Sequence, residues 1–407
     1  MVMSDKELYA ELRRRVMDKS DVCSAGGGED ERLFALIDEA ICEYARSSHL
    51  TLMQRIRTRK QVFASIRGYG AIQELLDDPD ITEIMVNGPG KIFFEKEGRI
   101  RRFEGEFETK AQLDDIVQKI AAGANRVINE ASPIVDARLA DGSRVNCVLQ
   151  PIAINGPIVT IRKFPKEVMT LERLTELGSI DEEAAVFLRR AIKAKLNIVI
   201  SGGTGTGKTT FLNALSGCIP PDERVITIED SAELQLNGIE NLVTLEARNA
   251  NVEGRNGVSI RDLIKTALRM RPDRIVVGEV RDGACIDMLQ ALNTGHSGMS
   301  TGHANSTADM LSRMETMCLL GADIPISAVR RQIASAIDLM IHLGRFRDKT
   351  RKVVEITEVA GYENDEIVLN TLYKYEELGE KEGRVEGRLI SAGNPFIRTD
   401  KFRAAGL

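Results

Sequence analysis

Apolar residues near the N-terminus recur every three or four positions, as on one face of an amphipathic helix. Two such runs are separated by the small-residue stretch Cys23–Gly28, which predicts a break between two helices. We therefore predict a charged helical N-terminal segment over residues 1–67. The positions that carry the pattern are Leu8, Leu12, Val16, Leu33, Leu36, Ile37 and Ile41.

The stretch 50–68 is basic and contains no acidic residue. One interpretation is a basic helix that docks on anionic lipid or on an acidic partner. The other is a solvated helix face that acidic neighbours neutralise, which is the more common reason for a run of charge. The sequence favours the solvated face and leaves docking open. The cations are Arg55, Arg57, Arg59, Lys60 and Arg67.

Between residues 68 and 166 the pattern changes to short strands around one helix. Strands at Glu83–Asn87 and Lys91–Glu95 flank Gly88-Pro89-Gly90, which predicts a turn. Thr109 is the predicted N-cap of a helix over Lys110–Ala122. Residues 68–166 therefore indicate a smaller α+β domain, followed by a linker over 167–180. Further strands are predicted at Val135–Leu139, Arg144–Val148 and Ile158–Ile161.

From residue 181 to residue 343, helices alternate with short apolar strands. This alternation is typical of an α/β domain in which helices cover both faces of a parallel sheet. Residues 344–407 are expected to form a C-terminal extension with short strands, at Val353–Val359, Ile367–Asn370 and Leu372–Tyr375, and a surface-bound tail. The predicted strands of the sheet are Ile198–Ile200, Val225–Ile228, Leu242–Leu245, Ile275–Val277, Met299–Thr301 and Leu339–Leu343.

The run Gly202-x4-Gly207-Lys208-Thr209 matches the phosphate-binding P-loop, or Walker A motif, and lies between a predicted strand and a predicted helix. Its glycines let successive N–H groups point at a phosphate, and the helix dipole adds positive potential there. Lys208 is expected to reach the β- and γ-phosphates. A chance match is the alternative, which the flanking elements disfavour. The predicted nucleotide-binding residues are Gly202, Gly203, Thr204, Gly205, Thr206, Gly207, Lys208, Thr209 and Thr210.

Acidic residues follow two of the predicted buried strands. Glu279 follows the strand predicted at Ile275–Val277, and Glu229 and Asp230 follow Val225–Ile228. Because ligands bind at the carboxyl ends of parallel strands, these acids are expected beside the P-loop. There they would bind Mg²⁺ or order water for hydrolysis, with Glu279 as the Walker-B-type residue. A charged strand end or a helix N-cap is the alternative. The predicted metal ligands are Thr209, Asp230 and Glu279.

Two histidines, His296 and His303, flank the strand predicted at Met299–Thr301. A metal pair is disfavoured, because no further soft ligands cluster nearby. An imidazole near the γ-phosphate is able to report its loss on hydrolysis. The residues alone favour this role for His303 no more than a structural one.

The composition is that of an ordinary globular protein, with 43% apolar and 29% charged residues in 407. This length suits two or three domains. The net charge of −6 provides no global attraction to nucleic acid or anionic membranes. The six scattered cysteines favour free thiols in a reducing cytosol over disulfides or a zinc site. No apolar run approaches the ~18 residues that span a bilayer, so we expect a cytoplasmic protein that reaches the membrane through partners.

Five segments resemble motifs that occur in this order in the type II/type IV secretion ATPase superfamily. They are Asp80–Gly88, the P-loop, Thr227–Asp230, Arg274–Asp282 and Gly295–Asn305. The resemblance covers residues 68–359 approximately and is greatest for the CpaF-like ATPases of Tad/Flp pilus assembly. It implies a RecA-like P-loop domain that binds ATP and Mg²⁺.

The resemblance also assigns roles to residues. Glu229 and Asp230 fall in the Asp box, Glu279 in an atypical Walker B motif that ends in Gly-Glu, and His303 in the His box. It implies a homo-hexameric ring in which nucleotide is held between the α+β domain and the P-loop domain.

Two arginines of the α+β domain, Arg144 and Arg162, resemble arginines that reach the phosphates in such ATPases. Positive charge there stabilises the transition state of phosphoryl transfer. A surface salt bridge is the alternative. Arg269, Arg271 and Arg281 lie close to Glu279 in the sequence, which does not rank them.

The chain departs from the superfamily pattern in its His box and in its insertions. Gly302 stands where a β-branched residue is more usual, and the added backbone freedom is expected to loosen the position of His303. The cysteine-rich zinc insertion of many type II secretion ATPases is absent, which argues against that branch. The long helical N-terminus argues against the retraction motors of type IV pili.

Together with the residues of the nucleotide site, the resemblance implies a hexameric ATPase that drives pilus assembly or protein secretion through nucleotide-driven domain movement, with inner-membrane platform proteins as partners. A nucleic-acid-stimulated motor is disfavoured by the acidic charge and by the 4% aromatic content without Trp. A GTP- or ATP-dependent switch is disfavoured by the lack of an Asn-Lys-x-Asp motif. The machine served and the role of residues 1–67 stay open. The predicted catalytic residues are Glu279, Glu229, His303, Arg144 and Arg162.

Overall fold

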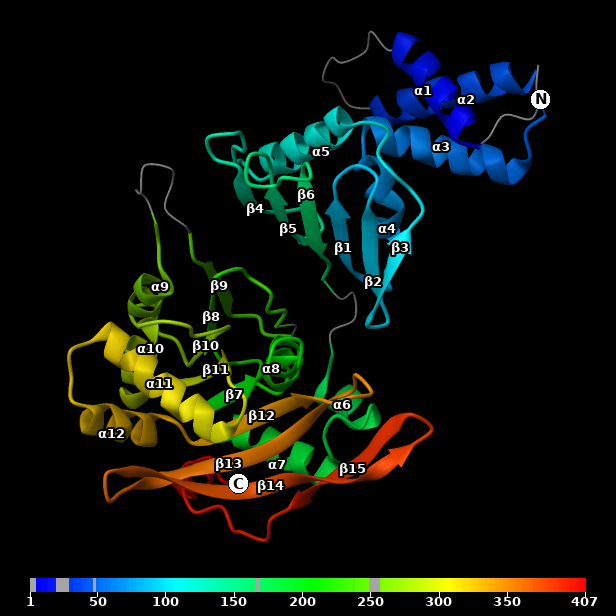
Figure 1. The fold of residues 1–407 in the computed structure, drawn as a ribbon. Helices are drawn as coiled ribbons and strands as arrows, with labels where there is room; N and C mark the ends of the chain where they lie inside the picture. The colour runs from blue at the N-terminus through cyan, green and yellow to red at the C-terminus, as the bar shows by residue number, and fades with distance from the viewer. Residues whose placement is uncertain (1–4, 20–28, 47–48, 165–168, 237, 249–256) are drawn as a thin grey trace. The chain divides into compact units, whose positions relative to one another are not determined.

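A computed structural model of the chain describes residues 5–19, 29–46, 49–164, 169–236, 238–248 and 257–407. The predicted break at Cys23–Gly28 lies outside these residues. The backbone divides into two compact units, residues 1–166 and residues 167–407, which Figure 1 draws from blue to red. Within the described residues, no helix is long and apolar enough to cross a membrane.

Three helices begin unit 1: α1 (Asp5–Lys19), α2 (Glu29–Ala45) and α3 (Leu52–Ile66). The apolar positions that predicted them form one cluster, in which Leu12, Val16 and Ile37 are fully buried. Thr51 starts α3 with a capping box. Its hydroxyl accepts a hydrogen bond from the Gln54 backbone amide, and the Gln54 side chain accepts one from the Thr51 backbone amide. The predicted N-terminal helices are therefore confirmed.

The rest of unit 1 is a six-stranded antiparallel sheet with helices against it. The strand order is β3-β2-β1-β6-β5-β4. Thr109 caps α5 by accepting a hydrogen bond from the Gln112 backbone, as the sequence predicted. The elements are η1 (Gly70–Ile72), α4 (Gln73–Asp77), β1 (Ile81–Asn87), β2 (Ile92–Lys96), β3 (Arg99–Phe103), α5 (Lys110–Gly123), β4 (Ile134–Arg138), β5 (Arg144–Val148) and β6 (Ile158–Arg162).

Unit 2 is built on a nine-stranded sheet of order β15-β14-β13-β12-β7-β11-β10-β8-β9. The strands from β12 to β9 are parallel, whereas β13, β14 and β15 continue the sheet in antiparallel fashion. The strands are β7 (Ile198–Gly202), β8 (Val225–Glu229), β9 (Leu242–Glu246), β10 (Arg274–Val277), β11 (Ser297–His303), β12 (Leu339–Arg345), β13 (Arg351–Glu363), β14 (Glu366–Lys381) and β15 (Arg384–Ser391).

Helices cover both faces of the parallel part of this sheet (Figure 1). One apolar cluster joins the sheet to α9, α10, α11 and α12, and a second joins it to α6, α7, α8 and α13. The strands β7, β8 and β10 are buried on both faces, as their continuous apolar runs predicted. The helices are α6 (Leu171–Glu176), α7 (Glu182–Lys193), α8 (Lys208–Ser216), α9 (Ile260–Ala267), α10 (Ala284–Asn293), α11 (Thr307–Gly321), α12 (Ile326–Ala336) and α13 (Asp400–Ala404).

The C-terminal extension differs from the short strands and tail expected of it. The strands predicted at Ile367–Asn370 and Leu372–Tyr375 are parts of the single long strand β14. The expected tail contains β15 and α13, and the buried Phe402 of α13 packs beside Phe187 of α7. Pairing along β13 extends these strands beyond what their local apolar pattern indicates.

Candidate nucleotide site

The P-loop connects the buried strand β7 to α8. Gly202 has φ +156° and Gly207 has φ +90°, backbone conformations that favour glycine. A Cβ on Gly202 would lie 2.6 Å from the Thr206 hydroxyl oxygen and 2.7 Å from the Leu343 carbonyl oxygen. The loop is thus a cradle that side chains would fill, and the first turn of α8 carries Thr209 and Thr210 beside it. This geometry fits a bound phosphate chain.

The predicted catalytic residues of neighbouring strands meet at this loop. His303 ends β11 and pairs in register with Gly202 of β7, which brings its ring to the mouth of the loop. The Lys208 ammonium lies 3.3 Å from His303 Nδ1, and His303 Nε2 lies 3.3 Å from Glu279 Oε1. The same ammonium donates to the carbonyl oxygens of Gly202 and Gly203, at 3.0 and 2.9 Å. Lysine, histidine and glutamate therefore form one continuous chain of polar contacts.

The contacts of His303 determine which of its ring nitrogens carries the proton. An ammonium only donates hydrogen bonds, so Nδ1 accepts from Lys208 and Nε2–H faces Glu279. Burial, and then the Lys208 charge, lower the pKa of His303 from its ordinary value of 6.5, against the opposing effect of Glu279. Both observations describe a neutral imidazole between the P-loop and the Walker-B-type glutamate.

Arg281 extends the chain of contacts to the Asp box. Its guanidinium donates to Glu279 Oε2 at 2.7 Å and lies 3.9 Å from Asp230. Hydrogen bonding to Glu279 raises the pKa of Arg281 above its ordinary value. Sequence reasoning noted this arginine but gave no reason to prefer it over Arg269 and Arg271. The structure brings it between Glu279 and Asp230.

Glu229 has a different environment from the other predicted acids. Its carboxylate is buried and accepts hydrogen bonds from the backbone amides of Glu233 and Leu234. A Cβ on Gly278 would lie 2.7 Å from the Glu229 Cγ. The Gly-Glu ending of the Walker B strand therefore leaves room for Glu229, which orders the segment after β8.

The expectation that Gly302 loosens His303 is wrong. Gly302 is buried within β11, and its backbone pairs with Ser201 of the neighbouring strand β7. A Cβ there would lie 2.3 Å from the Met310 Cε, so the missing side chain is replaced by a methionine from α11. The glycine provides space for packing and leaves the strand regular.

A cleft of about 490 Å³ opens beside the loop, within the size range of small-molecule sites. Its lining combines the P-loop with the end of β11 and the start of α11. The lining residues are Gly203, Thr204, His303, Ala304, Asn305, Asp309, Ser312 and Arg313.

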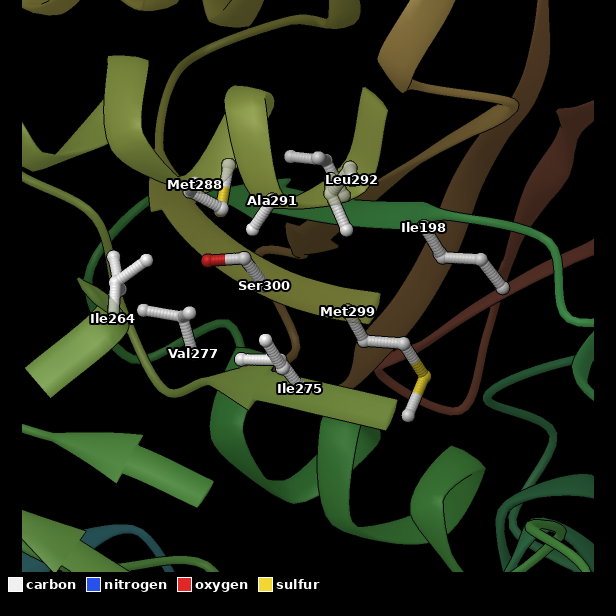
Figure 2. Close-up of a pocket in the computed structure, with 10 residues that line it drawn as sticks. Ile198, Ile264, Ile275, Val277, Met288, Ala291, Leu292, Met299 and Ser300 are labelled. Carbon is white, nitrogen blue, oxygen red and sulfur yellow. The ribbon is translucent and has the colours of Figure 1, made fainter. Parts of the chain in front are cut away.

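A second hollow, shown in Figure 2, lies inside the core of unit 2 and is not part of this site. Its walls are mostly apolar side chains of β7, β10, β11, α9 and α10, such as Ile275 and Leu292. At about 10 Å³ it has no space for a nucleotide and scarcely holds one water. The cleft beside the P-loop is the better candidate for ligand binding.

The two arginines predicted to reach the phosphates lie together in unit 1. Arg144 of β5 and Arg162 of β6 are directly paired in register. On one side, Arg138 of β4 pairs with Arg144, and on the other, Glu83 of β1 pairs with Arg162. The Arg162 Nε lies 3.9 Å from the Glu83 carboxylate. The arginines thus form one row across the sheet.

Arg351 is a residue of the loop environment that sequence reasoning missed. It begins β13, and its Nε donates to the carbonyl oxygen of Gly205 at 3.0 Å. Its register partner Arg345, at the end of β12, lies beside the same glycine. No local motif marks these arginines, because only the β12–β13 pairing brings them to the P-loop.

A profile of the type II/IV secretion system protein family matches residues 66–382. The chain belongs to this family. The match includes the whole site described above, together with the sheet of unit 1.

Curated relatives agree with this assignment. A putative conjugal transfer protein of Mycobacterium tuberculosis is 37% identical over 72% of this chain and 84% of its own length. The type IV secretion system protein PtlH of Bordetella pertussis is 35% identical over 70% of this chain and 92% of its own. The superfamily resemblance seen in the sequence is therefore confirmed, whereas these relatives do not single out its Tad/Flp branch.

Among solved structures, the pilus retraction motor PilT with bound ADP superposes with a TM-score of 0.52. The match covers 82% of this chain and 86% of PilT at 16% identity, which shows a common fold. The predicted RecA-like P-loop domain, preceded by a smaller α+β domain and N-terminal helices, is confirmed.

Proposed function

We propose that the protein is a Mg²⁺-dependent ATPase that drives a secretion or pilus machine. The observation that carries this proposal is the chain of contacts from Lys208 through His303 to Glu279 at the mouth of the P-loop. It supports the proposal that Lys208 binds phosphate while the Glu279 carboxylate orients water for attack on the γ-phosphate.

The residues at the loop suit Mg²⁺ held together with a nucleotide. The described residues contain no group of three or more histidines, cysteines or acids that would hold a metal ion alone. Mg²⁺ in phosphoryl-transfer sites is held by one or two carboxylates, waters and the phosphates themselves. The hydroxyl of Thr209 and the carboxylates of Glu279 and Asp230 are oxygen donors of this kind. When bound, the ion would neutralise charge that develops on the phosphates.

Each group of the chain has its own task in this proposal. The Lys208 ammonium exchanges its loop carbonyls for phosphate oxygens, and Glu279 accepts a proton from the attacking water. His303 responds to the γ-phosphate through Lys208 and passes the change to Glu279. Arg144 and Arg162 add positive charge at the phosphates, and Glu229 keeps the segment after β8 in place.

We further propose that the chain works as a homo-hexamer on inner-membrane platform proteins, as a peripheral protein at the inner face of the cell membrane. The named relatives support a transfer or secretion machine, since one is named as a putative conjugal transfer protein and the other as a type IV secretion system protein. The motif resemblance and the missing zinc insertion support the Tad/Flp pilus branch.

The test is ATP turnover by the purified chain, measured with its mass in solution. Hydrolysis that accompanies a hexamer and disappears in Lys208→Ala supports the proposal. Turnover at the wild-type rate in Lys208→Ala contradicts the assigned site. Turnover that requires single-stranded DNA would indicate a nucleic-acid motor instead.

A further inference from the structure

Helix α3 exposes apolar and cationic side chains together. Leu52, Met53 and Ile56 are 72%, 74% and 44% exposed, unusually high for residues of their type. The exposed cations Arg55 and Lys60 lie among them and form no ion pair within the described residues. We call these five residues the α3 face. No acidic residue occurs in the helix.

The α3 face is held outward by the packing of the rest of the helix. Thr58 and Val62 of α3 are buried in the three-helix bundle, and Phe63 stacks on Phe34 of α2 at 4.1 Å. Leu52, Ile56 and Lys60 follow one another at intervals of four, so they form a stripe away from Thr58 and Val62. The helices α1 and α2 therefore cover one side of α3, as Figure 1 shows, and the α3 face on the other side is exposed to solvent.

Acidic neighbours neutralise only part of the basic stretch. Arg59 lies 2.6 Å from the Asp38 carboxylate and over the Phe34 ring, so its charge is matched at the surface of the bundle. Within the part of the chain that the structure describes, no carboxylate pairs with Arg55 or Lys60. Arg67 lies 3.8 Å from the Asp30 carboxylate. The solvated, neutralised face that the sequence favoured therefore describes Arg59 and Arg67 but not Arg55 and Lys60.

We propose that the α3 face binds the surface of an anionic lipid bilayer. Exposed apolar side chains gain free energy by entering the headgroup region, and adjacent cations are attracted to the negative surface. The long stems of lysine and arginine allow their charges to stay at the phosphates while the apolar residues enter more deeply. The proposal goes beyond the ATPase function, since binding to lipid requires no nucleotide.

A bilayer fits the α3 face better than an acidic protein does. An anionic bilayer meets both components of the α3 face, because its phosphates attract the cations and its acyl region accepts the apolar side chains. An acidic protein would need an apolar patch beside its carboxylates to bury Leu52, Met53 and Ile56, whereas any anionic bilayer offers both.

The experiment uses the absence of tryptophan from the full chain. Met53→Trp introduces a single fluorophore on the α3 face, and Ile100→Trp introduces one at an exposed position of β3 in the same unit. Each variant is mixed with vesicles of phosphatidylcholine, with or without phosphatidylglycerol. We expect the emission of Met53→Trp to shift to shorter wavelength with the anionic vesicles alone, and that of Ile100→Trp to stay unchanged.

Charge reversal tests the electrostatic part. Arg55→Glu with Lys60→Glu should lower the vesicle partition coefficient of the full chain roughly tenfold or more. Arg99→Glu with Arg102→Glu, an equal charge change on exposed β3 residues, should leave it within about twofold. Binding should also decrease in 1 M salt, where the Debye length is about 3 Å. Circular dichroism verifies that each variant is folded.

Several outcomes would overturn the proposal. They are no binding of the wild-type chain to anionic vesicles, equal loss in both charge-reversal variants, or equal spectral shifts at positions 53 and 100. Lys208→Ala should bind vesicles as the wild type does, so a failure of the ATPase proposal is distinguishable from a failure of this one. Capture of an acidic protein without any lipid binding would assign the α3 face to a protein partner.

Discussion

Gly278→Ala tests whether the Gly-Glu ending of the Walker B strand exists to accommodate Glu229. The added methyl group would lie 2.7 Å from the Glu229 Cγ and 3.2 Å from its Oε2. Carbon atoms in contact are normally about 3.5–4.0 Å apart, so Glu229 must retreat by roughly 1 Å.

The retreat has a cost that follows from the contacts of Glu229. Its Oε2 accepts from the backbone nitrogens of Glu233 at 2.7 Å and of Leu234 at 3.1 Å. Moving by about 1 Å breaks at least one of these bonds, and a hydrogen bond to a charged group contributes about 1.5–3 kcal/mol. Overpacking adds about 1–3 kcal/mol. We expect the free energy of unfolding of unit 2 to fall by roughly 2.5–6 kcal/mol.

The assay is urea unfolding followed by circular dichroism, with Gly361→Ala as the matched control. Gly361 lies in β13 of the same unit, and a Cβ there meets no atom within 4 Å. Its substitution should change stability by about 0.5 kcal/mol or less. Equal stability of the two variants would refute the steric explanation.

Three further predictions follow from single contacts. Glu223→Gln should destabilise unit 2 by about 3–5 kcal/mol, because it removes the counter-charge of the fully buried Arg274. In the wild type the Arg274 guanidinium lies 3.0 Å from the Glu223 carboxylate. A loss of less than about 1 kcal/mol in urea unfolding would contradict this prediction. Burial lowers the pKa of His303 below 6.5, so the unfolded state binds more protons than the folded state near this pH. The stability that depends on neutral His303 is therefore fully present above pH 6.5. It is lost as the pH falls through the pKa of the folded state. The free energy of unfolding of the wild type, relative to that of His303→Gln, should therefore decrease on acidification. A difference that does not change with pH would contradict the lowered pKa of His303. Arg351→Ala removes a 3.0 Å hydrogen bond to the Gly205 carbonyl, which contributes about 1 kcal/mol. A fluorescent ATP analogue should therefore bind to this variant roughly fivefold more weakly than to the wild type. Unchanged affinity would show that Arg351 does not support the P-loop.

Sequence reasoning predicted the parts of the fold that local patterns specify. The apolar runs between helices predicted the parallel strands, because a strand buried on both faces needs such a run. Thr109 predicted the start of α5, because its hydroxyl satisfies a backbone amide that the helix leaves open. The P-loop followed from glycines at fixed spacing, and the strand-end rule placed Glu279 and His303 beside it.

The remaining features depend on pairing between distant segments. Strand β3 carries mostly charged residues, so its pattern does not reveal an edge strand. The contact of Arg351 with Gly205 exists only because β13 returns beside β12. For Glu229, the sequence showed an acid at a strand end but not that backbone amides would occupy its carboxylate.

The most direct test of the central claim compares Glu279→Gln with Glu386→Gln, the same change at an exposed residue of β15. ATP turnover and ATP binding are measured on both variants and on the wild type. If Glu279 activates water beside the P-loop, its variant should retain ATP binding and lose turnover by about a hundredfold or more, while Glu386→Gln behaves as the wild type. Turnover in Glu279→Gln within a few-fold of the wild-type rate would contradict the account.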